Sequence, residues 1–359
     1  YTAHHSNTLN MVLFTLTLMI GTAGLPHVIM RFFTVPRVSD ARWSAGWTLV
    51  FIALLYLTAP AVGAMARLNI TEMMWPNGTQ GEAVSVEQIE TDPDYAWMQT
   101  WQQTGLLGWE DKNGDGRIQY YNDASPDMAE RAAAAGWEGN ELTNFNRDIL
   151  VLANPEIANL PGWVIGLVAA GGIAAALSTA AGLLLAISSA VSHDLLKGQL
   201  TPNMSEKNEL LSARISMAVV IVIATILGMN PPGFAAQTVA LAFGLAAASI
   251  FPALMMGIFT KRVNNVGAVA GMLVGLVTTL VYIFLHKGWF FIEGTNSFTD
   301  ADPLILSIAS TSFGAIGALL NFGTAIMVSR ATAEPPQEIQ DLVESVRVPR
   351  GAGAAAADH

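Results

Sequence analysis

The stretch VGAVAGMLVGLVTTLVYIFL at residues 266–285 decides the fold class because it holds no charged residue over a membrane-spanning length. The hydrocarbon core of a bilayer is about 30 Å thick, and a helix of about 20 apolar residues crosses it. Gly267, Gly271 and Gly275 recur at four-residue spacing within the stretch. That spacing is typical of membrane helices that pack closely on one another. The stretch therefore predicts a tightly packed transmembrane helix.

Similar apolar stretches recur along the whole chain, separated by polar breaks. The composition agrees, since 52% of the residues are hydrophobic and 13% are charged, whereas soluble domains average about 25% charged residues. We therefore expect an all-α integral membrane protein with about seven transmembrane helices in a lipid bilayer. The predicted spans are residues 9–30, 47–66, 162–190, 215–229, 234–259, 266–285 and 304–328.

The acidity of the chain is local. The formal net charge is −11, and residues 71–160 alone hold 16 acidic and 4 basic residues. The rest of the chain holds 12 acidic and 13 basic residues and is nearly neutral. A net negative charge argues against a nucleic-acid partner, because phosphate binding requires basic residues. The absence of cysteine excludes disulfide scaffolds and thiolate metal sites.

Charge placement also predicts the topology and the domain order. Lys and Arg follow the first, third, fifth and seventh predicted spans, and basic residues favour the cytoplasmic side. Residues 1–70 are expected to form two transmembrane helices, and residues 71–160 an acidic extracytoplasmic insertion. Five helices over residues 161–328 and a mostly disordered cytoplasmic tail over residues 329–359 would follow. The membrane is expected to be a bacterial inner membrane.

The first predicted span is interrupted by GTAGLPH at residues 21–27. Two glycines and a proline weaken the helical hydrogen-bond ladder and free backbone N–H and C=O groups. At membrane depth such groups are tolerated where they face protein or a water-lined cavity. Transporters bind substrates and ions at discontinuous helices of this kind. The alternative is a proline kink that binds no ligand.

Ser178 and Thr179 lie side by side in the third predicted span, within AAALSTAAG at residues 174–182. Hard cations prefer oxygen ligands, so adjacent hydroxyls and nearby carbonyls would suit a partly dehydrated sodium ion. The alternative is that each hydroxyl donates a hydrogen bond to its own helix and binds no ion.

Together these motifs resemble a known family, the sodium/solute symporters. The stretch GTAGLPHVIMRFFTV at residues 21–35 is similar to the G-x-P-H-I-x-x-R-F helix of that family, and most similar to its acetate permease branch. AAALSTAAG, followed by SHDLL at residues 192–196, is similar to a later core helix. Residues 243–271, with a Phe-Pro pair and a Thr-Lys-Arg turn, fit the next part of the pattern.

The resemblance implies a LeuT-like inverted-repeat transporter that works by alternating access, with this chain as its C-terminal half. A missing N-terminal half would supply further sodium and substrate contacts. The coupling sodium ion would be bound by the hydroxyls of Ser178 and Thr179 and by the carbonyl of Ala175. The helix break would face the substrate, a small organic anion. The implied substrate-binding residues are Gly21, Thr22, Gly24, Pro26 and His27.

The acidic insertion contains a second motif, DKNGDGRIQ at residues 111–119. It matches the EF-hand calcium loop at positions 1, 3, 5 and 6, but Asn122 replaces the glutamate expected at position 12. The alternative is a turn rich in Asp, Asn and Gly that binds no ion. The candidate calcium ligands are Asp111, Asn113, Asp115, Arg117 through its carbonyl, Gln119 and Asn122.

The function that these features predict is sodium-coupled symport of a small organic solute, acetate or another monocarboxylate. The competing function is a membrane sensor in which a symporter-like core reports ligand or calcium occupancy. An enzyme is not expected, because the sequence contains no arrangement typical of acid–base or nucleophilic catalysis. These residues leave open which solute is carried and whether sodium ions or protons are the coupling ion.

Overall fold

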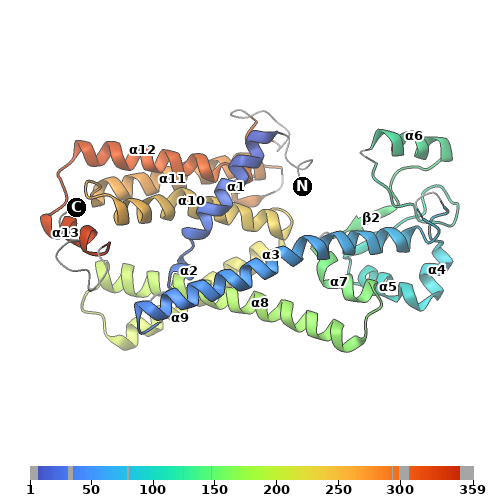
Figure 1. Ribbon diagram of the computed structural model, residues 1–359, viewed down its shortest axis with the longest axis horizontal. Helices are drawn as coiled ribbons and strands as arrows, with labels where there is room; N and C mark the ends of the chain where they lie inside the picture. The colour runs from blue at the N-terminus through green and yellow to red at the C-terminus, as the bar shows by residue number, and fades with distance from the viewer. Residues whose placement is uncertain are drawn as a thin grey trace. The chain divides into compact units, whose positions relative to one another are not determined.

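The computed structural model (Figure 1) describes residues 7–30, 35–78, 81–123, 125–146, 148–292, 294–298 and 307–347. The chain divides into two compact units. One unit comprises Tyr1–Pro36 and Gly182–His359, and the other comprises Arg37–Ala181.

Six helices among the described residues are long and apolar enough to cross a membrane. This finding supports the predicted all-α membrane protein, and the boundaries agree best for the third, fifth and sixth predicted spans. The helices are α3 (Val38–Met74), α8 (Gly162–Ser189), α9 (Glu206–Met229), α10 (Ala235–Phe259), α11 (Asn265–Lys287) and α12 (Gly314–Ala331).

The first predicted span is not one continuous helix. It forms α1 (Thr8–Ala23) of 16 residues, followed by the four-residue helix α2 (Pro26–Ile29). Pro26 has no N–H to donate to the preceding turn, and Leu25 between the helices is extended. Residues 31–34, the end of the first motif, lie outside the described residues.

Other predicted boundaries also differ. The second predicted span, residues 47–66, is the middle part of α3, which extends beyond it at both ends. Helix α9 begins at Glu206, well before the predicted start at residue 215, because Ser205 caps it and its first turns are polar. At the seventh predicted span, residues 304–306 lie outside the described residues. A short 3₁₀ turn, η6 (Ser310–Ser312), follows, and α12 begins at Gly314.

Helices α10, α11 and α12 pack on one another, and α1 packs on α10 and α12 (Figure 1). The glycine stripe of α11 faces α12. A methyl group at Gly271 would overlap Asn321, and one at Gly275 would lie 3.0 Å from the Gly317 carbonyl oxygen and would also overlap the Ala248 carbonyl oxygen of α10. The close packing predicted from the stripe is thus found in the structure.

Helix α1 is held to the start of α12 by buried polar side chains. The Ala309 N–H donates to Asn10 Oδ1 at 2.7 Å. Thr17 Oγ1 donates to the Ser312 carbonyl at 3.1 Å and accepts from the Ala315 N–H at 2.9 Å. Because Asn10 and Thr17 are buried, these bonds fix the position of α1 against its neighbours.

The second unit carries the acidic segment as a small folded region with its own apolar core. Strand β1 (Leu107–Trp109) pairs antiparallel with β2 (Leu142–Phe145). Ile89, Met98 and Ile118 are fully buried, and Met74 at the end of α3 joins the same core. The remaining elements are α4 (Val86–Thr91), η3 (Pro93–Tyr95), α5 (Ala96–Gln103), α6 (Pro126–Ala135) and α7 (Leu150–Ile157).

Three further elements complete the first unit. A π-helical stretch, η4 (Ala190–Leu200), continues α8 and contacts α9. A short turn, η5 (Trp289–Phe291), follows α11. In the tail, α13 (Gln337–Ser345) forms and contacts α10, whereas residues 348–359, which are also part of the predicted disordered tail, lie outside the described residues.

Candidate functional site

The two predicted sodium-binding hydroxyls meet at one backbone oxygen on α8. Ser178 Oγ donates to the Ala175 carbonyl at 3.0 Å, and Thr179 Oγ1 donates to the same carbonyl at 3.1 Å. Helical spacing explains this, because residues three and four apart lie on one face. Both side chains are exposed. Serine and threonine hydroxyls in helices that bind no ion make the same hydrogen bonds to their own backbone. Sodium binding therefore stays a prediction.

This cluster has the chemistry that a hard cation requires. It consists of neutral oxygens, and each hydroxyl oxygen keeps lone pairs while its proton points at Ala175. A cation that approaches would turn both hydroxyl protons away and take their place at the carbonyl. The cluster could therefore exchange internal hydrogen bonds for ion contacts by side-chain rotation alone.

The two glycines of the predicted substrate site pack against α10. Gly21 and Gly24 are buried. A methyl group at Gly24 would lie 2.8 Å from the Ala246 carbonyl oxygen and 3.2 Å from the Phe251 nitrogen, and one at Gly21 would overlap the Phe243 carbonyl. These glycines allow α1 and α10 to approach closely, which is a role that the sequence interpretation did not include.

The other predicted substrate residues lie differently around the break. Thr22 and Pro26 are exposed, and His27 is half-buried. Thr22 Oγ1 donates to the Leu18 carbonyl at 2.7 Å. At the end of α1, the Gly24 N–H donates to the Gly21 carbonyl at 2.9 Å. Among the predicted substrate residues, Thr22 and Pro26 are therefore the exposed ones.

The close contact between α1 and α10 gives a test of this packing. Gly24→Ala is expected to lower the free energy of unfolding by about 1–3 kcal/mol, because the added methyl group must displace α10 backbone atoms. Gly63→Ala in α3 is the matched control, since no atom lies within 4 Å of its added methyl group. Thermal unfolding in detergent measures both. Equal unfolding temperatures for the two variants would contradict the contact.

The calcium-like loop of the insertion is closed by the carboxylate of Asp111. Its Oδ1 accepts from the Gly114 N–H at 2.7 Å, and its Oδ2 accepts from the Gly116 N–H at 2.8 Å. Both glycines have positive φ angles, 72° and 74°, which glycine adopts without strain. Further along the loop, Gln119 Nε2 donates to Asp115 Oδ2 at 2.7 Å. The loop is thus ordered by its own side chains.

A second carboxylate in this loop region, Glu141, was missed by the sequence analysis. It is fully buried. Its Oε1 accepts from the Lys112 N–H at 2.8 Å and from the Asn113 N–H at 3.4 Å, and its Oε2 accepts from the Gln119 N–H at 2.9 Å. No local motif links Glu141 to a loop more than 20 residues away in sequence.

The structure gives no independent support for a metal in the loop. Among the described residues, no group of three or more His, Cys, Asp or Glu side chains is placed to hold a metal ion. The guanidinium of Arg117 donates to the Ala83 carbonyl at 2.7 Å, and the carbonyl of Asn122 accepts from the Ser125 N–H. Calcium binding therefore stays a prediction.

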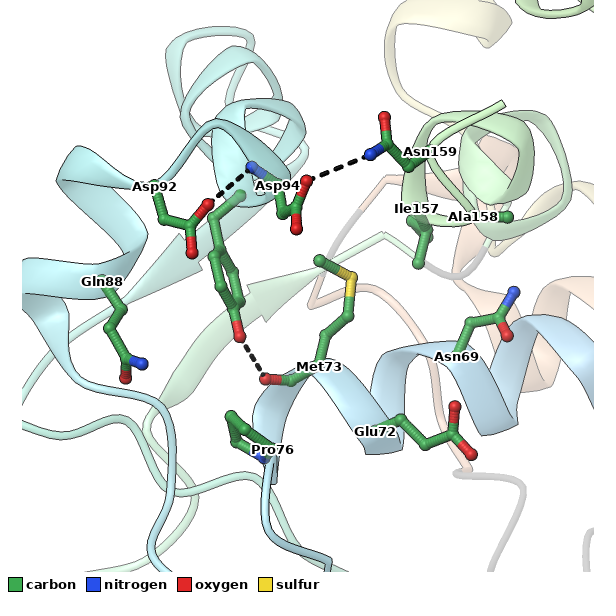
Figure 2. Close-up of a pocket in the computed structure, with 11 residues that line it drawn as sticks. Asn69, Glu72, Met73, Pro76, Gln88, Asp92, Asp94, Ile157, Ala158 and Asn159 are labelled. Carbon is green, nitrogen blue, oxygen red and sulfur yellow. Dashed lines mark hydrogen bonds between the residues drawn. The ribbon is translucent and has the colours of Figure 1, made fainter. Parts of the chain in front are cut away.

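A separate cavity of about 480 Å³ lies between the end of α3 and the segments around Tyr95 and Asn159 (Figure 2). Tyr95 donates to the Met73 carbonyl at 2.9 Å, and Asn159 Nδ2 donates to Asp94 at 3.0 Å. Burial, together with the carboxylates of Asp92 and Asp94, raises the pKa of Tyr95. The cavity is lined by none of the predicted sodium, substrate or calcium residues, so we assign it no role in transport.

The similarity to known proteins agrees with the motifs. Residues 135–275 match the model of the sodium:solute symporter family, and this range includes the hydroxyl pair on α8. The chain belongs to this family. A symporter-family chain with six candidate spans is a multi-pass membrane protein.

Two symporter relatives extend the similarity beyond that range. The chain is 36% identical over 341 residues to an uncharacterized symporter of Cupriavidus necator, and the aligned region covers 94% of this chain and 45% of the relative. It is 29% identical over 300 residues to a monocarboxylic acid transporter of Corynebacterium glutamicum, and the aligned region covers 83% of this chain and 42% of that protein. The chain thus spans less than half the length of either relative.

Proposed function

We propose that this chain is part of a sodium-coupled symporter that carries a small organic acid, acetate or another monocarboxylate, by alternating access. The observation that carries the proposal is the convergence of the Ser178 and Thr179 hydroxyls on the Ala175 carbonyl. Family membership supports sodium as the co-transported ion. The similarity to a protein named as a monocarboxylic acid transporter supports the substrate class.

In the proposed site, sodium binds at the α8 cluster as cargo. The hydroxyls of Ser178 and Thr179 and the carbonyl of Ala175 supply three neutral oxygens. Hard cations take more oxygen ligands than three, so the remaining ligands come from elsewhere in the complete transporter. Because all three oxygens are uncharged, the ion is held weakly enough to leave when the site opens to the other side.

The substrate carboxylate is placed at the break between α1 and α2. Thr22 and Pro26 are the exposed members of the predicted set, and His27 is half-buried. Gly21 and Gly24 act indirectly, because they set the distance between α1 and α10. Transporters bind anionic substrate groups at helix breaks. Here the N–H groups of Gly24, Leu25, Val28 and Ile29 donate to carbonyls of residues 21–25, so a substrate carboxylate would replace some of these bonds.

Topology completes the proposal. The acidic insertion lies outside the cytoplasm, the C-terminus lies inside, and the membrane is a bacterial inner membrane. A preceding half of the protein completes a LeuT-like inverted repeat. The sensor alternative receives no support, since both relatives carry transporter names.

Uptake of labelled solutes by membrane vesicles that contain the complete protein tests the substrate class. We expect an inward sodium gradient to increase the uptake of acetate or propionate, and an excess of unlabelled short monocarboxylates to suppress it. Amino acids and sugars should not compete. Sodium-stimulated uptake of a sugar or an amino acid, but of no monocarboxylate, would contradict the proposed substrate class.

Calcium binding by the insertion is a second, separate proposal, supported by the closed loop around Asp111. Titration of the protein with calcium should give a saturable heat signal that is lost in Asp115→Asn. Asp127→Asn, at an exposed position in α6, should keep the signal. No saturable heat with the unmodified protein would identify the loop as a structural turn.

A further inference from the structure

Proline 252 lies inside the membrane-length helix α10 and removes one hydrogen bond from it. Since proline has no N–H, the carbonyl four residues earlier, at Ala248, receives no hydrogen bond from its own helix, and the ring disturbs the adjoining turn. In a membrane an unpaired carbonyl is costly because no water is available to replace the lost donor. The sequence alone does not show what compensates for this loss.

The compensating group comes from α12. Asn321 is fully buried, and its Nδ2 donates to the Ala248 carbonyl at 2.8 Å and to the Ser249 carbonyl at 2.9 Å. Beside it, Phe322 of α12 meets Phe251 of α10 edge to face, with ring centroids 6.2 Å apart. One amide thus satisfies two carbonyls of the disturbed turn and connects α12 to it.

The break in α1 lies against the same turn of α10. Gly24, which directly follows α1, lies so close to α10 that an added methyl group would be 3.2 Å from the Phe251 nitrogen. Phe251 directly precedes Pro252. Two interrupted helices therefore meet, and the amide of Asn321 fixes the shape of one of them (Figure 1 shows α1, α10 and α12 together).

We propose that Asn321 is a positioning residue for transport: it clamps the proline break of α10 and thereby holds the α1 break in its substrate-binding position. This inference rests on the proposed function of the α1 break. Loss of the clamp would let the turn of α10 around Ala248 rearrange, and the Gly24 segment would follow, although Asn321 touches neither substrate nor ion.

A double-mutant comparison tests the clamp without any transport assay. Asn321→Ala leaves the Ala248 carbonyl without a donor and removes one donor from the Ser249 carbonyl, so it should lower the unfolding temperature in detergent. Pro252→Ala restores an N–H that can donate to the Ala248 carbonyl within α10. In a Pro252→Ala background, Asn321→Ala should therefore lower the unfolding temperature much less than it does in the unmodified protein. An equal loss in both backgrounds would overturn the clamp.

Uptake kinetics of the complete protein test the positioning role. Asn321→Ala should raise the half-saturating acetate concentration about three- to tenfold, the range expected for an interhelical hydrogen bond in a membrane. Pro252→Ala in the same protein should reverse most of that rise. The matched control is Ser329→Ala, because Ser329 is also buried on α12 but accepts from the Asn264 N–H instead of binding α10.

The possible results separate this inference from the proposed function. If the unmodified protein shows no sodium-stimulated uptake of any monocarboxylate, the proposed function is wrong, while the unfolding comparison still tests the clamp. If uptake is normal but Asn321→Ala leaves the half-saturating concentration unchanged, the positioning role is wrong. A rise of the same size in Ser329→Ala would also overturn it, because the effect would then belong to α12 packing in general.

Discussion

Replacing Ser178 and Thr179 together with alanine is expected to raise the half-saturating sodium concentration for uptake at least about tenfold, because each lost oxygen contact to an ion is worth about 1.5 kcal/mol or more. The variant removes both hydroxyls that meet at the Ala175 carbonyl. Helix α8 should stay intact, since alanine is a better helix former than serine or threonine. Uptake rates measured over a series of sodium concentrations give the result.

The matched control for this experiment is Ser188→Ala on the same helix. Ser188 Oγ donates to the Leu185 carbonyl three residues earlier at 3.0 Å, just as Ser178 does to Ala175. If the hydrogen bond from the hydroxyl to its own helix were the only role of these serines, replacing either one would change the sodium dependence of uptake equally. We expect Ser188→Ala to leave the sodium dependence unchanged. Unchanged sodium dependence in the double variant as well would remove Ser178 and Thr179 from the ion site.

Glu141→Ala is expected to destabilise the insertion by about 3 kcal/mol, because backbone N–H groups that lose a charged acceptor in a buried place are costly. The carboxylate accepts from the N–H groups of Lys112, Asn113 and Gln119. The fluorescence of the insertion's tryptophans during thermal unfolding reports the loss. A chelator in the buffer keeps any effect of calcium out of the comparison.

Glu138→Ala is the control for this prediction. Glu138 is a nearby glutamate in the same acidic segment, but it is exposed. Surface substitutions of this kind usually change the stability by about 0.5 kcal/mol or less. An unfolding temperature for Glu141→Ala equal to that of Glu138→Ala would show that the loop does not depend on the buried carboxylate.

The membrane helices could be predicted because hydropathy is a local property. The apolar runs at residues 234–259 and 266–285 end within two residues of α10 and α11. Helix α9 was predicted to start too late, because its first turns contain Glu206 and Glu209 and are polar. Apolar length does not detect a helix start that is set by a polar cap such as Ser205.

The candidate site was predictable only where its residues are close in sequence. The positions of Ala175, Ser178 and Thr179 on one helical turn follow from the period of the helix. The contacts of Gly24 with α10, of Asn321 with the Ala248 carbonyl and of Glu141 with the insertion loop join residues far apart in sequence. Sequence periodicity contains no signal for such contacts.

The most direct test of the central claim is accumulation of labelled acetate by sealed vesicles that contain the complete protein. A sodium gradient directed inward is the only energy source. We predict transient accumulation above the external acetate concentration, which disappears when potassium replaces sodium or when a sodium ionophore dissipates the gradient. Equal uptake with and without the sodium gradient, or accumulation driven only by a proton gradient, would contradict sodium-coupled symport.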